Sequence, residues 1–439
     1  MNNDTGAKIP HARLAKYRVL AMLAELASQR TMNFAILDQV MVSGANFLGG
    51  ILLARAFGMY EFGRFSLAWM FVEFFGSLQF ATIIQPMLTI GAKQAKDDTN
   101  RYYQAVIAQQ AAACMLFGFL AWLGTTLAGW LFSDPEFHRL GLPLCAAVIT
   151  YQLHCFFRRY FFARDRVLAA LCTDALRFAA QIVATAALLF GWPDATAAAG
   201  IWIVAAACSL SAIQGVCFFG RLRWNTASFR SVAARHWEFS KWLLPSALMF
   251  WMTSQGFLVM SGLALGAAAT GAMRAALSIT GVLHIVLLAL DNFAPVRAAR
   301  ALHLGGPAAL RRYLAHLAVL TGVLTMATVT LISIAPGYVV HLLYGQQYEG
   351  IDELVRWLCA PLAVYAISTV LVIWAAAIEQ TQVIFVSYVV ATAFTILAAY
   401  PLTLYGGLAG IVLGTLLVEL IRVGSLLIPL LRWRGAINA

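Results

Sequence analysis

The sequence predicts an all-α polytopic membrane protein, with twelve transmembrane helices in two six-helix lobes and with both termini in the cytoplasm. Hydrophobic residues make up 62% of the 439 residues, and the mean hydropathy is +0.78. Twelve apolar stretches are each long enough to cross a hydrocarbon core of roughly 30 Å, which takes about 20 helical residues. Of the 30 Lys and Arg residues, 23 fall on the N-terminal tail, alternate loops and C-terminal end, five on the opposite loops and two inside apolar stretches. Positive charge resists translocation, so this asymmetry places both termini inside.

The predicted helices are the twelve apolar stretches, six in each lobe. The N-terminal lobe, 34–220, contains helices at 34–57, 64–90, 104–132, 140–163, 167–190 and 196–220. The C-terminal lobe, 240–439, contains helices at 240–265, 270–295, 313–335, 354–378, 382–402 and 406–431. The remaining segments are a cytoplasmic tail at 1–33 and a basic cytoplasmic linker at 221–239.

The two lobes resemble each other in sequence, which indicates an internal repeat. Gly58 and Gly63 flank the turn between the first two helices, and Gly266 and Gly271 stand in like places between the seventh and eighth. Proline and tyrosine residues then recur at nearly equal spacings in both halves. Since six crossings return the chain to its starting side, the halves have parallel topology.

Composition excludes several classes of function. A net charge of +11 would suggest nucleic acid in a soluble protein. Here the cytoplasmic loops account for it, because they face anionic lipid, so we expect membrane lipid and no nucleic acid as a partner. The seven cysteines lie in apolar stretches without a CxxC motif, which is typical of packing residues and not of a metal site. The loops are too short for a catalytic domain, so we expect no enzyme activity and no cofactor.

The predicted helix at 270–295 has one polar face. Ionisable groups within a membrane are costly, and each therefore suggests a functional role. At 100° per residue, a sector of about 140° contains Arg274, Ser278, Gly281, His284, Asp291 and Asn292. This face meets either a wet cavity or a polar seam against neighbouring helices.

Two carboxylates in the first two helices are further candidates. Glu73 shares a face with Ser66 and Ser77 and lies roughly 14 Å inside the helix at 64–90, at 1.5 Å per residue. It is a candidate for proton coupling, the alternative being a Glu paired with a hydroxyl or an Arg inside the lobe. Asp38 lies about one turn inside the helix at 34–57 and could simply interact with the helix end.

Buried arginines occur in both lobes. One stripe of the helix at 167–190 is polar and consists of Asp174, Arg177, Gln181 and Thr185. Asp174 and Arg177 are spaced i, i+3 and could form a structural ion pair, while Arg177 could instead hold a phosphate by a two-pronged contact. Glu419 and Arg422 have the same spacing in the C-terminal lobe and the same two interpretations.

The opening "LDQVMVSGANFLGGILLARAFGMYEFGRFSLAW" (37–69) and the turn "LLYGQQYEG" (342–350) carry a family resemblance. They resemble the polysaccharide-transporter branch of the multidrug/oligosaccharidyl-lipid/polysaccharide (MOP) exporter superfamily, which includes Wzx-type O-antigen and exopolysaccharide flippases. The likeness covers nearly the whole chain and is strongest over 34–90, and no single motif is diagnostic. It implies two lobes in a V around a cavity lined by helices 1, 2, 7 and 8. It therefore favours the cavity interpretation for helix 8 and makes Asp38 a candidate for the cavity mouth.

The resemblance implies a flippase that moves an undecaprenyl-diphosphate-linked oligosaccharide, an O-antigen or exopolysaccharide repeat unit, across the bacterial inner membrane by alternating access. It also implies a glycan polymerase and a chain-length regulator as partners, and it leaves coupling to H+ or Na+ open. Related peptidoglycan-precursor flippases carry two further helices, so twelve helices favour the O-antigen and exopolysaccharide branch.

Three other classes of membrane protein fit the sequence less well. An ion-coupled multidrug antiporter of the same superfamily should present an acidic, aromatic pocket to a cation. Here the deep acids are few, and Asp174 and Glu419 have arginines nearby. A major-facilitator transporter should carry a Gly-x-x-x-Asp-Arg/Lys turn after helix 2, which "IGAKQAKDDTNR" (90–101) does not match. A membrane glycan polymerase or glycosyltransferase needs a sizeable external loop, which the sequence lacks.

Overall fold

The computed structural model describes residues 11–94, 96–131, 135–192, 195–219, 226–291 and 294–432. Side chains are described from residue 34 on, except those of 35, 36, 96–98, 135, 136, 226, 227, 284–286, 288, 289, 291 and 432. All regular secondary structure in the described residues is helical, as the hydropathy pattern predicts.

The N-terminal lobe begins with the long helix α1, His11–Gln79, which folds back on itself at Gly58. Gly58 has φ 68° and ψ 177°, a conformation that side chains disfavour, so the helix reverses at a glycine. A π-helical turn η1, Phe80–Ile84, and the short α2, Gln85–Gly91, complete the second crossing. The remaining helices of this lobe are α3, Lys96–Leu131, α4, Pro135–Ala163, α5, Val167–Gly191, and α6, Ala197–Phe219.

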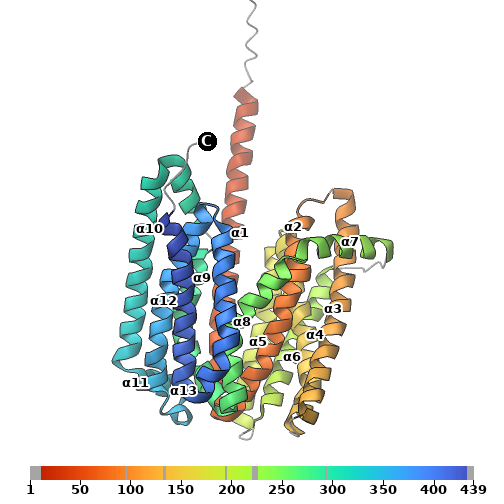
Figure 1. The fold of residues 1–439 in the computed structure, drawn as a ribbon. Coiled ribbons are helices and arrows are strands. Elements are labelled where there is room, and N and C mark those ends of the chain that lie inside the picture. Colours follow the sequence, from red (N-terminus) through yellow and green to blue (C-terminus); the bar gives the residue numbers. More distant parts are fainter. Residues whose placement is uncertain are drawn as a thin grey trace, which may run out of the picture.

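A helix, α7, Thr226–Ser240, occupies most of the stretch predicted as linker and packs against α3 at one end of the N-terminal lobe (Figure 1). The C-terminal lobe follows with α8, Leu243–Leu265, α9, Ala267–Asp291, and α10, Ala294–Ile334. It ends with α11, Pro336–Tyr344, the 3-10 turn η2, Gln346–Tyr348, α12, Asp352–Ala377, and α13, Thr381–Arg432. Helices α10 and α13 are kinked at Gly306 and Gly407, which both have positive φ.

The chain makes the twelve crossings that the sequence predicts. Nine helices in the described residues are long and apolar enough to span a membrane. Two of them, α1 and α13, reverse at Gly58 and Gly407 and so cross twice, and α9 adds one more crossing. The beginning of α1 and the end of α13 lie at the same end of the molecule (Figure 1). Which compartment faces this end stays a prediction from the charge asymmetry.

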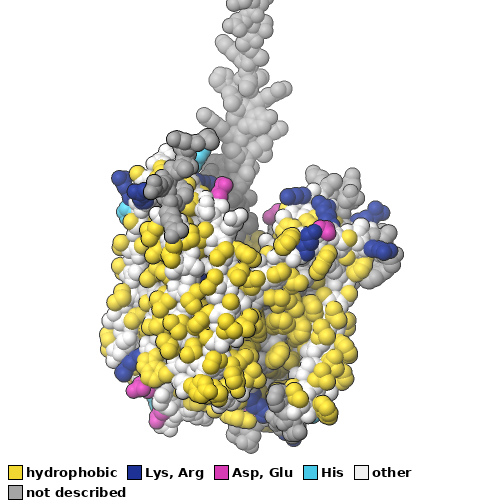
Figure 2. Space-filling view, viewed as in Figure 1, with side chains coloured by type: hydrophobic (Ala, Val, Ile, Leu, Met, Phe, Trp, Pro, Cys, Tyr) yellow, Lys and Arg dark blue, Asp and Glu magenta, His cyan; other side chains and the backbone are white. Residues whose placement is uncertain are grey.

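Hydrophobic side chains cover the flanks of both lobes, and Lys and Arg gather chiefly near the beginning of α1 and the end of α13 (Figure 2). The hollow between the lobes widens toward this end, which we call the open end (Figure 2). Helix α1 joins the lobes, because it packs on α5 of its own lobe and on α8 and α9 of the other.

The lobes meet most closely at the opposite, closed end, through a reciprocal contact between two glycines. A Cβ atom on Gly63 would lie 1.7 Å from the carbonyl oxygen of Ala267, and one on Gly271 would lie 1.9 Å from that of Met59. Gly266 has the conformation of Gly58, with φ 90° and ψ 177°. The predicted repeat of four glycines thus corresponds to a two-fold backbone contact between equivalent turns.

Side chains reinforce the closed end from both lobes. Arg55 in α1 donates hydrogen bonds to the carbonyl oxygens of Leu343 at 2.8 Å and Leu342 at 2.5 Å, in the last turn of α11. A cation there complements the partial negative charge of a helix C-terminus. The hydroxyl of Tyr348 donates to the carbonyl oxygen of Ala54 at 3.2 Å. Access to the space between the lobes is therefore restricted at this end.

Candidate functional site

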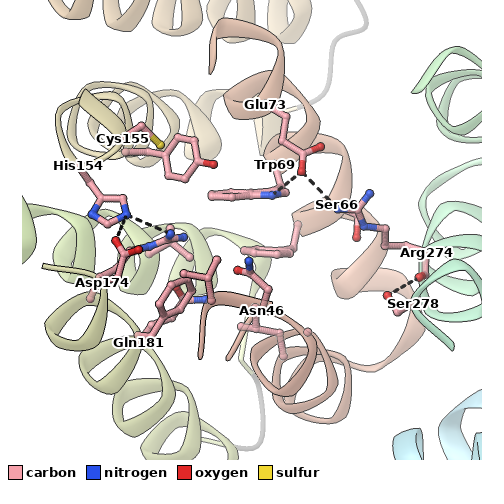
Figure 3. A pocket seen from close by; sticks show the side chains of 18 of the residues that line it. Asn46, Ser66, Trp69, Glu73, His154, Cys155, Asp174, Gln181, Arg274 and Ser278 are labelled. Carbon is pink, nitrogen blue, oxygen red and sulfur yellow. Dashed lines mark hydrogen bonds and ion pairs between the residues drawn. The ribbon is translucent and has the colours of Figure 1, made fainter. Parts of the chain in front are cut away.

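A cavity of about 340 Å³ lies in the N-terminal lobe where it faces the C-terminal lobe (Figure 3). Its walls come from α1, α4, α5 and α6, and α9 of the other lobe adds Arg274 and Ser278. Five charged side chains line it, namely Glu73, Arg158, Asp174, Arg177 and Arg274. The concentration of charge within a membrane-spanning bundle marks this cavity as the candidate site.

One arginine on the wall of the cavity connects three helices. The side chain of Arg158, on α4, donates from Nη2 to the Oδ2 atom of Asp38 on α1 at 2.6 Å. Its Nε donates to the Oδ2 atom of Asp174 on α5. Both carboxylates are buried, with at most 1% of their surface exposed. A guanidinium shared by two carboxylates explains how both acids can stay inside the lobe.

The structure places Asp174 with Arg158 instead of Arg177, so the predicted Asp174–Arg177 ion pair does not form. Spacing of i, i+3 brings two residues near each other on a helix surface but does not fix where the long arginine side chain points. Arg158 reaches Asp174 from the neighbouring helix, and the guanidinium of Arg177 packs elsewhere.

Arg177 lies between aromatic rings on the wall of the cavity. Its Cζ atom is 4.4 Å from the ring centre of Phe178 and 5.2 Å from that of Tyr151. Its Nη1 lies 3.4 Å from Nε2 of His154, and its Nε has no hydrogen-bond partner although the residue is only 5% exposed. Cation–π contacts hold the guanidinium in place without neutralising its charge.

His154 stands between the acid and the second arginine. Its Nε2 is 3.4 Å from an Oδ1 atom of Asp174 and 3.4 Å from Arg177, as Figure 3 shows. Its Nδ1 lies 2.7 Å from the hydroxyl of Ser211 on α6. The ring therefore lies between the carboxylate of Asp174 and the guanidinium of Arg177 within the same wall.

The other predicted members of the α5 stripe also lie on the buried face. Gln181 lines the cavity, and its Oε1 atom is buried without a hydrogen-bond partner. Thr185 is fully buried one turn further along, and its hydroxyl also lacks a partner. Polar atoms left in this way favour a ligand or water on this face of the helix.

Glu73 joins the two lobes across the cavity. Its carboxylate accepts hydrogen bonds from Nε1 of Trp69 at 3.1 Å and from Nε2 of Gln255 on α8 at 3.3 Å. Arg274 on α9 approaches it to 3.6 Å, as Figure 3 shows. Ser77, predicted beside Glu73, donates to the backbone carbonyl oxygen of Glu73 at 3.0 Å. The sequence predicts that Glu73 either couples protons or pairs with a hydroxyl or an arginine inside its own lobe. The structure pairs it with an arginine, but this arginine comes from the opposite lobe.

The structure describes part of the polar face predicted for the helix at 270–295, which is α9. Arg274 and Ser278 line the cavity, and the hydroxyl of Ser278 donates to the carbonyl oxygen of Arg274 at 2.8 Å. The side chains of His284 and Asp291, and the whole of Asn292, lie outside the described residues. Their role in a cavity stays a prediction.

The pair predicted in the last helix forms in the structure. Nη1 of Arg422 donates to Oε1 and Oε2 of Glu419 at 2.9 and 3.1 Å. No group of three or more His, Cys, Asp and Glu side chains in the described part of the chain is arranged to hold a metal ion.

Sequence reasoning missed Arg158, because it was counted among the charges of a cytoplasmic loop. It lies five residues before the end of α4, which is roughly 8 Å inside the helix at 1.5 Å per residue. The available signal was its spacing of four from His154, which puts both residues on one helix face. His154 is a single histidine within an apolar stretch, and no sequence pattern marks Gln255.

The sequence matches no protein-family model, and no curated protein matches it. Solved structures do match over most of the chain. An inward-facing multidrug resistance MATE family transporter of the MOP superfamily matches with a TM-score of 0.68 and 14% identity, over 91% of this chain and 96% of that one. Lipid II flippase MurJ in an inward closed conformation gives a TM-score of 0.66 at 12% identity, over 91% and 87%.

A third solved structure that matches is in an outward-facing conformation. An outward-facing MATE transporter of the MOP superfamily gives a TM-score of 0.52 at 13% identity, over 93% of this chain and 94% of that one. These three proteins are transporters or flippases by description. The chain therefore has the fold that these MATE transporters and the flippase MurJ share.

Proposed function

We propose that this protein is a flippase that carries a lipid-linked oligosaccharide with a diphosphate group from the inner to the outer leaflet of a bacterial inner membrane. The observation that supports it is Arg177, a buried guanidinium on the cavity wall with an unpartnered Nε and with no carboxylate of the described side chains within 4 Å. A diphosphate supplies the oxygens that such a guanidinium binds best.

The state of the structure fits loading from the cytoplasmic leaflet. The hollow between the lobes widens at the end that carries both termini, and the closed end is joined by backbone contacts. The TM-score is higher for the inward-facing than for the outward-facing MATE structure. We infer that the open end faces the cytoplasm, as the distribution of basic residues predicts.

Transport then consists of shielding polar groups from hydrocarbon. Sugar hydroxyls and phosphate oxygens would lack hydrogen-bond partners there, whereas the prenyl tail is stable in lipid. The headgroup occupies the cavity while the tail stays between the lobes in the bilayer. Rocking of one lobe against the other would then expose the headgroup on the far side, and Glu73 and Arg274 lie at the interface that must rearrange.

An ion-coupled multidrug antiporter is the main competing function, because MATE transporters share the fold. A cation would need a free carboxylate in the cavity. Asp38 and Asp174 are both engaged by Arg158, and Glu73 faces Arg274. Among the described charged residues that line the cavity, Arg177 has no carboxylate within 4 Å, and this guanidinium favours an anionic cargo. Coupling to H+ or Na+, and partnership with a glycan polymerase, stay predictions.

The test is binding of undecaprenyl diphosphate to the purified protein, combined with lipid extraction from a deletion strain. We expect Arg177→Gln to weaken binding by about 10- to 100-fold, since a hydrogen bond to a charged group contributes roughly 1.5–3 kcal/mol. Arg177→Lys should retain part of the affinity, and Arg311→Gln, at an exposed site on α10, should retain all of it. The deletion strain should accumulate a lipid-linked glycan. Ethidium efflux by the wild-type protein, without any binding of undecaprenyl diphosphate, would establish the antiporter instead.

A further inference from the structure

A second cavity lies in the C-terminal lobe, outside the charged site described above. It measures about 430 Å³, within the usual range of roughly 300–1,000 Å³ for ligand pockets. Helices α8, α9, α12 and α13 form its walls. It differs from the N-terminal cavity in charge and in hydrogen-bonding character.

The charged groups of this cavity neutralise each other. Glu419 and Arg422 are its two charged lining residues among those described, and Arg422 donates to both carboxylate oxygens. Ser368 donates a further hydrogen bond to Oε2 of Glu419 at 3.1 Å. With no net charge, the cavity attracts neither a phosphate nor an organic cation, and it suits a neutral ligand.

The hydroxyl groups on the wall face the cavity as hydrogen-bond acceptors. Each donates its own proton to a backbone carbonyl oxygen of its helix, at 2.7 to 3.4 Å for the set Thr253, Ser254, Thr280, Thr369 and Thr415. A hydroxyl oxygen has two lone pairs, so each still accepts when its proton is used. The ligand that fits this wall must bring several donors.

Arg422 supplies the complementary donor and an aromatic surface. Its Nε is buried without a partner in a residue that is 7% exposed. Its Cζ lies 4.9 Å from the ring centre of Tyr388, which packs edge-on against Phe250. The cavity thus combines acceptors, one buried donor and apolar rings, and a ligand with hydroxyl groups and apolar C–H faces matches all three.

The two cavities are neighbours across the lobe interface. Gln255 lines the C-terminal cavity, and its Nε2 donates to Glu73 on the wall of the N-terminal cavity. On α9, Leu277 lines one cavity and the next residue, Ser278, lines the other. A ligand with two chemically different parts can therefore reach both cavities.

We infer that the C-terminal cavity binds a neutral, hydroxyl-rich sugar of the cargo while the N-terminal cavity holds the diphosphate. This inference rests on the proposed function. It assigns Arg177 in the N-terminal cavity to the diphosphate that all such lipids share, and the C-terminal cavity to the glycan.

The experiment compares two probes, undecaprenyl diphosphate and undecaprenyl-diphosphate-linked N-acetylglucosamine, with wild-type protein and the double variant Thr369→Val/Thr415→Val. Valine keeps the shape and removes the acceptor. We expect the sugar to tighten binding to wild type by about 10-fold and to give a gain of about 2-fold or less in the variant. Affinity for undecaprenyl diphosphate should not change. Thr126→Val, on α3 away from both cavities, is the matched control, because its hydroxyl also donates to its own helix.

The outcomes separate the two proposals. If wild type binds undecaprenyl diphosphate and the sugar adds nothing, or if the double variant keeps the full gain, the inference is wrong and the proposed function stands. If the double variant binds both probes more weakly by the same factor, the inference is also wrong, because the two substitutions would then have disturbed the fold as a whole. Wild-type protein that binds neither probe overturns the proposed function and the inference with it. Competition by tetraphenylphosphonium that depends on Thr369 and Thr415 would assign the cavity to cations and would contradict a neutral ligand.

Discussion

The reciprocal glycine contact at the closed end leads to a prediction about the balance between conformations. A methyl group on Gly63 would lie 1.7 Å from the carbonyl oxygen of Ala267, and real Cβ atoms essentially never approach closer than 3.0 Å. The difference requires the turns to separate by about 1.3 Å. Since the obstructing atom belongs to the backbone, it cannot rotate away. Gly271→Ala creates the same conflict with the carbonyl oxygen of Met59, at 1.9 Å.

The size of the effect follows from the cost of overpacking, which is roughly 1–3 kcal/mol. Each 1.4 kcal/mol is a factor of ten, so the closed-end conformation should lose about 5- to 150-fold in population relative to its alternative. We therefore expect Gly63→Ala and Gly271→Ala to shift the protein away from the conformation seen here, without preventing its insertion.

Distance measurements across the open end test this shift. Spin labels at Lys93 and Arg300, in a background without the native cysteines, should report shorter distances in the Gly63→Ala and Gly271→Ala variants. The matched control is Gly322→Ala on α10, where an added methyl has nothing within 4 Å. If the glycine variants give the same distances and the same transport as Gly322→Ala, the contact does not hold this end closed.

Two further predictions concern buried ionisable groups. Arg158→Met strands the carboxylates of Asp38 and Asp174, at about 3–5 kcal/mol, so we expect little protein in the membrane by quantitative blotting. Adding Asp38→Asn and Asp174→Asn should restore the amount, and persistent loss would contradict the bridge. Burial lowers the pKa of His236 on α7 from 6.5 to about 4. Because the unfolded chain takes up the proton first, α7 should lose up to roughly 3 kcal/mol of packing stability as pH falls from about 6.5 to 4. Hydrogen exchange of α7, corrected for intrinsic rates, should show this loss in wild type and not in His236→Gln; equal behaviour of the two would exclude the histidine as the cause.

Sequence reasoning recovers what local patterns determine. The repeat of Gly58 and Gly266 is visible because a sharp reversal needs a residue that tolerates positive φ, and both glycines adopt it. The twelve crossings can also be predicted, because the length and hydropathy of a segment decide whether it can span lipid as a helix. Both signals belong to a residue or a continuous segment of the chain and do not depend on tertiary contacts.

Tertiary partners are what the patterns could not supply. Asp174 has arginines available on two helices, and helical spacing favoured Arg177 although the packing of α4 on α5 gives it Arg158. Glu73 and Arg274 were each identified as polar residues of separate helices. Their approach depends on how one lobe meets the other, and no periodicity within a single helix contains that information.

Helix α7 determines where the chain must bend if the lobes move. The chain passes from the N-terminal to the C-terminal lobe through α7, whose buried His236 lies 2.9 Å from the hydroxyl of Tyr102 on α3. The connection is thus fastened to the N-terminal lobe almost to its end, and α8 begins at Leu243. Lys241 and Trp242 form the turn between them. We expect this two-residue turn to bend when the lobes move, so stiffening it with proline should slow exchange between states while leaving each lobe intact.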